Sequence, residues 1–120
     1  MSPYPRPVVL ERKIATLKQQ LMALGDLRPG SLSEQYNVCG TPGCQCKADP
    51  PRKHGPYYQL SYVHRGKSTS QFIRPQFLRE VKAQLANYKQ FRRLIDTWIH
   101  FSIEYARARL DELKRSTSHR

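Results

Sequence analysis

The chain has 120 residues, the size of one domain with a modest core. Lysine and arginine number 21 against nine aspartate and glutamate, and this net charge of +12 favours an anionic partner, nucleic acid before a membrane surface. No stretch approaches a membrane span, no secretory signal is visible, and the three cysteines lie too close together for a disulfide framework, so a cytoplasmic protein is expected.

The N-terminal part of the chain is expected to be an arm followed by a helix. Residues 1–7 are rich in proline, and a helical pattern begins at Val8 and stops at Gly25. The aliphatic residues of this helix lie on one stripe: Leu10, Ile14, Leu17, Leu21 and Leu24. Their spacing is that of a short heptad seam, and packing within the same domain is preferred over a coiled coil.

The most informative segment follows a short strand expected within residues 31–38. It holds every cysteine and a histidine in the spacing C-x4-C-x-C-x7-H: Cys39, Cys44, Cys46 and His54. Three thiolates and one imidazole are the ligands of a closed, tetrahedral Zn²⁺ site, and Pro42 and Gly43 would turn the chain between the first two thiols. His64 and Asp49 are alternatives to His54 as the fourth ligand. The competing interpretation is packing or redox cysteines without a metal.

A β-hairpin is expected next. Residues 57–63 and 68–73 are rich in aromatic, β-branched and hydroxyl side chains, and Gly66 can supply the positive φ of the turn between them. Strand alternation places three side chains on the core face: Tyr58, Leu60 and Tyr62. Two strands alone are marginal in water, so the hairpin should pair with a third strand near Tyr36 or lean on the cysteine segment or a helix.

The hairpin is also the candidate nucleic-acid surface, because no acidic residue occurs between Tyr57 and Pro75. A ribbon that carries cations and hydrogen-bonding side chains can enter a major groove, whereas tyrosines on such a ribbon can instead stack single-stranded bases. The predicted contact residues are Gln59, Ser61, Arg65, Lys67, Gln71 and Arg74. Cations spread along the following helix would contact phosphates.

A long helix is expected after Pro75, from about Gln76 to Lys114, because no glycine or proline interrupts this segment. Such a helix would be about 57 Å long, more than a 120-residue globule covers, so it should pair with the first helix or with a second copy of the chain. The alternative is two helices broken near Arg92–Asp96. The expected stripe is Val81, Leu85, Tyr88, Ile95, Ile99 and Leu113, broadened by Phe77, Phe91, Trp98 and Tyr105.

The fold class predicted from these elements is α+β. It combines an N-terminal helix, a zinc-knuckle loop with a small antiparallel hairpin or three-stranded sheet, and a long C-terminal helix. Residues 8–115 would form a single zinc-stapled domain between the arm at 1–7 and a frayed tail at 116–120.

An ordered series of short pieces resembles a bacterial domain-of-unknown-function family. The pieces are Gly30-Ser31-Leu32, Cys39-Gly40-Thr41-Pro42-Gly43-Cys44-Gln45-Cys46, His54-Gly55-Pro56-Tyr57-Tyr58-Gln59-Leu60-Ser61-Tyr62 and Gly66-Lys67-Ser68. The resemblance covers about residues 28–95. Members of that family are small standalone proteins, often encoded beside transposases or in mobile elements, so the resemblance implies a nucleic-acid-binding accessory with a transposase as one partner.

Two functional hypotheses remain. The first is a Zn²⁺-binding accessory or regulator that binds nucleic acid, DNA rather than RNA. The second is a helical assembly subunit that forms a homodimer or binds an acidic protein. An enzyme is not expected, because Glu34 and Asp49 near the cysteines form no metalloenzyme motif, and no motif supports a thiolate nucleophile at Cys44 or Cys46.

Overall fold

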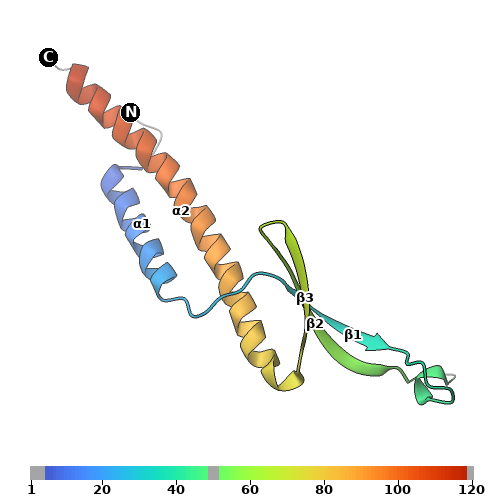
Figure 1. Ribbon diagram of the computed structural model, residues 1–120. Helices are drawn as coiled ribbons and strands as arrows, with labels where there is room; N and C mark the ends of the chain where they lie inside the picture. Colours follow the sequence, from blue (N-terminus) through green and yellow to red (C-terminus); the bar gives the residue numbers. More distant parts are fainter. Residues whose placement is uncertain (1–4, 49–51, 119–120) are drawn as a thin grey trace. The chain divides into compact units, whose positions relative to one another are not determined.

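The computed structural model describes residues 5–48 and 52–118 (Figure 1). Its main elements are α1 (Pro7–Met22), β1 (Ser31–Asn37), β2 (His54–His64), β3 (Lys67–Ile73) and α2 (Leu78–Ser118). Two short 3₁₀ turns, η1 (Gln45–Lys47) and η2 (Pro75–Phe77), precede β2 and α2. The strands form one antiparallel sheet in the order β1-β2-β3, so the predicted α+β layout with a three-stranded sheet is confirmed.

The chain forms two compact units. One unit is Leu27–Tyr88, which contains the sheet and the first turns of α2. The other unit joins the described residues up to Asp26 to those from Lys89 onward, so it contains α1 and the rest of α2. Part of the expected arm, residues 1–4, and the end of the expected tail, residues 119–120, lie outside the described residues.

In the sheet unit, one face of the sheet is buried against the start of α2. Leu60, Ile73, Val81 and Leu85 form its buried core, and Tyr58, Tyr62, Leu32 and Leu78 pack around them. The predicted core face of β2 is therefore confirmed. β2 begins at His54 rather than at Tyr57, because β1 supplies pairing partners as far as Asn37↔His54. Burial of each large aliphatic side chain in this core contributes about 1.5–3 kcal/mol.

In the helix unit, α1 lies antiparallel to the C-terminal part of α2 (Figure 1). The Lys13 ammonium lies 5.1 Å from the centre of the Phe101 ring, and the Tyr105 hydroxyl donates a 2.9 Å hydrogen bond to Glu11. Four side chains on the facing stripes are buried: Leu10, Leu17, Leu94 and Ala108. α1 ends at Met22, three residues before the predicted stop at Gly25, and the Ala23 N–H caps it by donating to Gln19.

The second helix is one uninterrupted element. α2 runs from Leu78 to Ser118, so a break near Arg92–Asp96 is wrong and the helix extends past Lys114. The predicted stripe is wrong at its end, because Ile99 and Leu113 are about half exposed while α1 covers a neighbouring stripe. Within the described residues, no helix is long and apolar enough to cross a membrane.

Candidate functional site

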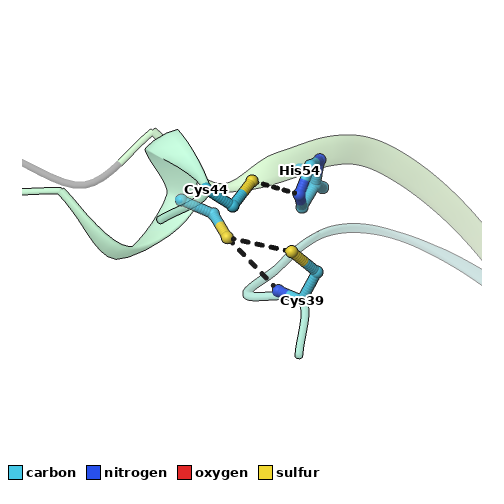
Figure 2. Close-up of side chains that lie close together, drawn as sticks. Cys39, Cys44 and His54 are labelled. Carbon is cyan, nitrogen blue, oxygen red and sulfur yellow. Dashed lines mark hydrogen bonds between the residues drawn. The ribbon is translucent and has the colours of Figure 1, made fainter. Parts of the chain in front are cut away.

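The cysteines and the histidine lie in the connection between β1 and β2. Cys39 follows the last residue of β1 by two positions, and His54 is the first residue of β2. Because the two strands are antiparallel and Asn37 pairs with His54, the ends of this connection meet. Figure 2 shows Cys39, Cys44 and His54 turned toward one another.

A tight turn places Cys44 beside Cys39. The Cys44 N–H donates a 3.4 Å hydrogen bond to the Thr41 carbonyl across Pro42 and Gly43. Proline at the second position and a glycine with φ of 76° at the third are the residues that a type II turn requires. The 3₁₀ turn η1 follows directly and carries Cys46, whose side chain is buried at 1 % exposure.

The four side chains converge on one point. The three Sγ atoms and the imidazole nitrogen of His54 all lie within 4.8 Å of one another. Cys39 Sγ is 3.4 Å from Cys46 Sγ, and Cys44 Sγ is 3.2 Å from His54 Nε2 (Figure 2). In a tetrahedral site with Zn–S bonds of about 2.3 Å, neighbouring sulfurs are about 3.8 Å apart. The cluster therefore has nearly the dimensions of a tetrahedral metal site.

Local hydrogen bonds favour a thiolate at one of these positions. A hydrogen bond from the Thr41 backbone, followed by bonds from the Cys46, His54 and Cys44 side chains, lowers the pKa of Cys39 to about 6. Burial has the opposite effect on Cys46 and raises the pKa of its thiol. The Cys39 N–H donates a 3.3 Å hydrogen bond to the Cys46 sulfur, which places a partial positive charge beside it. A bound cation would favour the thiolate at every cysteine.

His64 and Asp49 were the alternatives to His54 as the fourth ligand. His64 stands at the opposite end of β2, ten residues from His54, which corresponds to about 30 Å along a strand, so it cannot reach the cysteines. Asp49 lies outside the described residues. Of the two histidines in β2, His54 is the one whose ring meets a cysteine sulfur.

The six predicted nucleic-acid contacts do not share one surface. Gln59 and Ser61 lie on the outer face of the sheet, where Gln59 accepts a hydrogen bond from Gln35 and Ser61 bonds to Ser70. Gln71 pairs with Leu60 and therefore lies on the opposite, inner face. Lys67 shares that inner face by alternation along β3. Arg65 stands at the turn, with a φ of 50°, and Arg74 follows β3.

A cavity of about 370 Å³ lies on the inner-face side of the sheet unit. It is lined by two of the predicted contacts, Gln71 and Arg74, and by Arg28, Phe77, Glu80 and Gln84 among others. Sequence reasoning missed Arg28 and Gln84. Arg28 lies in the connection after α1, and its backbone N–H donates a 3.2 Å hydrogen bond to the Gln84 carbonyl. No local sequence pattern signals this contact, because 56 positions of numbering separate Arg28 from Gln84.

Comparison with known proteins gives a family but no activity. Residues 9–83 match the family described as "Domain of unknown function (DUF6788)". The matched segment contains the three strands, all four clustered side chains and the start of α2. Neither a curated protein nor a solved structure shows a significant match to the chain. Because the match covers more than half of the sequence, the predicted membership in a family of unknown function is confirmed, and the chain belongs to the DUF6788 family.

Proposed function

We propose that this protein binds one Zn²⁺ ion through Cys39, Cys44, Cys46 and His54, and that the ion fixes the structure of a basic, nucleic-acid-binding accessory protein. The observation that carries the proposal is the convergence of these four side chains within 4.8 Å. A donor set of three sulfurs and one nitrogen favours Zn²⁺ over Mg²⁺ or Ca²⁺, which prefer oxygen.

The ion would have a structural role. A catalytic zinc keeps one position open for water or substrate, whereas four protein ligands close the coordination shell. The connection from Val38 to Lys53 also needs such support, because Cys46 is its sole buried side chain among the residues that the structure describes. A metal that joins both ends of this connection would replace the missing apolar core. We therefore propose no enzymatic reaction at this site.

Zinc stoichiometry tests the metal site. We expect one zinc per chain in protein purified without added metal, measured by elemental analysis. Cys44→Ser should lose the ion because it removes one thiolate, and His54→Ala should weaken binding by about 10-fold or more. His64→Ala is the matched control, since it makes the same change at the other end of β2 and should retain full zinc. A folded wild-type protein without zinc would contradict the proposal.

The nucleic-acid part of the proposal rests on charge. The chain carries a net charge of +12, and the hairpin turn, β3 and the residue after β3 carry Arg65, Lys67 and Arg74 in a segment without acidic residues. All three side chains are exposed. The resemblance to a family often encoded beside transposases supports DNA as the nucleic acid and a mobile element as the setting.

Salt dependence of binding tests this part. The affinity for a short DNA duplex, followed by fluorescence anisotropy, should fall linearly on a plot of log affinity against log salt concentration. Replacing Arg65, Lys67 or Arg74 by glutamine should reduce the slope by about 1 for each phosphate that the replaced cation neutralises. Arg12→Gln is the control, because it removes the same charge from an exposed position on α1. Equal slopes for all variants would contradict a contact surface at the hairpin.

A second candidate function is helical assembly. Large aliphatic side chains lie exposed along α2 in a heptad-like seam: Ile99, Ile103, Leu110 and Leu113, with exposed fractions of 53, 51, 50 and 48 %. Ala106 completes the 4-3-4-3 spacing. An apolar groove at Ile95, Trp98, Ile99 and Ile103 continues the seam toward Lys89, in the N-terminal direction along α2. This observation supports a homodimer formed by two α2 helices.

A further inference from the structure

Two neighbouring cavities on the inner-face side of the sheet unit form the strongest unexplained feature of this protein. The first is the cavity of about 370 Å³ at Gln71, Arg74 and Gln84. The second has a volume of about 250 Å³ and lies at Tyr62 and His64. Arg28 and Gln71 line both cavities, so the two recesses adjoin each other at these side chains.

The walls combine planar apolar surface with polar groups. Phe77 lines the first cavity and is 50 % exposed, and the Tyr62 ring lines the second. The Oε1 atom of Gln84 is buried and has no hydrogen-bond partner among the described residues. An unsatisfied buried carbonyl is unfavourable, so rotation of this amide toward an N–H donor in the cavity would be favoured. The Glu80 carboxylate is a second acceptor on the same wall.

The charges that line the recesses favour an anion at the arginines and a neutral group at the hydrogen-bond acceptors. Arg28 and Arg74 are the cations that line the first cavity, and Arg28 continues into the second. Guanidinium groups bind phosphate oxygens through two parallel hydrogen bonds. Acceptors and guanidinium groups that line the same recess match a nucleobase with its N–H groups and its attached phosphate. A stacked and paired base cannot enter such a recess, whereas an unpaired base can.

We propose that the two cavities hold the bases of two consecutive unpaired nucleotides, with Arg28 at the phosphate that joins them. This inference rests on the proposed nucleic-acid binding and names its ligand as single-stranded or extruded nucleotides rather than a paired duplex. Arg74 contacts the phosphate beyond the first base, and Gln84 accepts a hydrogen bond from that base. Phe77 and Tyr62 provide apolar contact for the two bases.

Three DNA probes of one sequence test the site on the full-length, zinc-loaded protein by fluorescence anisotropy. They are a short paired duplex, the same duplex with two adjacent unpaired nucleotides at its centre, and that bulge with its two bases removed. We expect the bulged probe to bind about tenfold more tightly than the paired duplex, since stacking of one base contributes about 1–3 kcal/mol. The probe without the two bases should lose this gain, because it keeps only the phosphates.

Two variants with matched controls test whether the tighter binding of the bulged probe depends on the two cavities. Gln84→Met removes the unpaired amide oxygen and keeps the side-chain length, so the fold should persist while the preference for the bulge falls about tenfold. Gln20→Met makes the same change on the exposed surface of α1 and should leave the preference intact. Arg28→Gln should weaken binding of the bulge about tenfold, whereas Arg12→Gln should leave the preference for it unchanged.

The outcomes separate the two proposals. Absence of binding to every probe overturns the proposed nucleic-acid function and this site with it. Equal binding of the paired and bulged probes overturns the nucleotide site alone, because general DNA binding then persists. A bulge preference that Gln84→Met and Arg28→Gln leave unchanged also overturns the site, because the unpaired bases are then held elsewhere.

Discussion

At the scale of single residues, Gly55 has a conformation that sets the position of the candidate ligand His54. Its φ is 137°, a value that L-residues rarely adopt, and a Cβ atom at this position would lie 2.7 Å from the Gln35 carbonyl oxygen of the paired strand. The strands pair on both sides of this position, at Gln35↔Tyr57 and at Asn37↔His54, so the backbone has little room to move. Strain of this kind costs about 1–3 kcal/mol for one residue.

We therefore expect Gly55→Ala to lower the free energy of unfolding by about 1–3 kcal/mol or more and to weaken zinc binding, because His54 would be displaced. Urea denaturation and a competition assay with a zinc chelator measure the two effects. Gly40→Ala is the control, since nothing lies within 4 Å of its Cβ position and its φ is not in the left-handed region. Similar losses in both variants would show that the contact with Gln35 is not responsible.

The cysteines should differ in reactivity once the metal is removed. Hydrogen bonds, the largest contribution being from the Thr41 backbone, lower the pKa of Cys39 to about 6, while burial raises the pKa of Cys46. In metal-free, reduced protein at pH 7 we expect iodoacetamide to modify Cys39 before Cys46, with a pH midpoint near 6 for Cys39. Peptide mass spectrometry identifies the site, and modification of Cys46 first would contradict this order.

The same shift makes the metal-free fold sensitive to acid. A folded-state pKa below the unfolded value contributes stability that is fully present above the unfolded pKa and is lost as the pH falls through the folded one. The Cys39 contribution should therefore fade as the pH decreases through about 6. Thermal unfolding of the metal-free protein between pH 8 and pH 5 should show a falling unfolding temperature. Cys39→Ser should remove the part of this fall that comes from Cys39.

At the scale of elements, α2 carries two apolar stripes and α1 covers one of them. Leu94 and Ala108 face α1 and are buried, whereas Ile103 and Leu110 are about half exposed. If the exposed seam joins two copies of the chain, wild-type protein should sediment as a dimer at micromolar concentration. Ile103→Glu with Leu110→Glu should yield monomers, because a carboxylate in an apolar interface is strongly unfavourable.

A control on the same helix tests whether charge alone causes dissociation. Thr97→Glu adds a carboxylate at an exposed position of α2 that lines neither the seam nor the apolar groove, and it should leave the dimer intact. Analytical ultracentrifugation over a range of concentrations distinguishes these cases. A wild-type protein that stays monomeric throughout would contradict the helical-assembly candidate and would not affect the zinc site.

Features formed by residues close together in the sequence could be predicted, whereas contacts between residues far apart in the sequence could not. The four clustered side chains fall within 16 residues, and the turn motif at Pro42 and Gly43 predicts that they come together. The face of Gln71 needed the register of the hairpin, which depends on the two-residue turn after His64. The contact of Arg28 with Gln84 had no local signal, because it depends on how distant segments pack.

For the long helix α2, the sequence likewise did not predict which apolar side chains are buried. Periodicity alone predicted that Ile99 and Leu113 would share a stripe with Val81 and Leu85, yet the former are exposed and the latter buried. A helix of 41 residues drifts relative to any fixed repeat, so its apolar side chains divide into separate stripes along its length. Which stripe is covered depends on the side on which α1 packs, and the sequence of α2 does not contain this information.

At the scale of the whole molecule, the metal site and the packed helices belong to different units. The four candidate ligands lie within Leu27–Tyr88, whereas α1 packs on the part of α2 that follows Lys89. α1 makes contacts within its own unit, such as that of Lys18 over the Trp98 ring at 5.4 Å. Removal of zinc should therefore disturb one unit and spare the other.

We expect a zinc chelator to increase amide hydrogen exchange in the segment 38–53 and in the adjoining ends of β1 and β2. Exchange in α1 and in the C-terminal part of α2 should remain slow, and the helical circular dichroism signal should change little. Mass spectrometry of peptides from both units measures the difference within one experiment. Loss of protection in α1 on chelation would contradict this separation and would mean that the metal site supports the whole molecule.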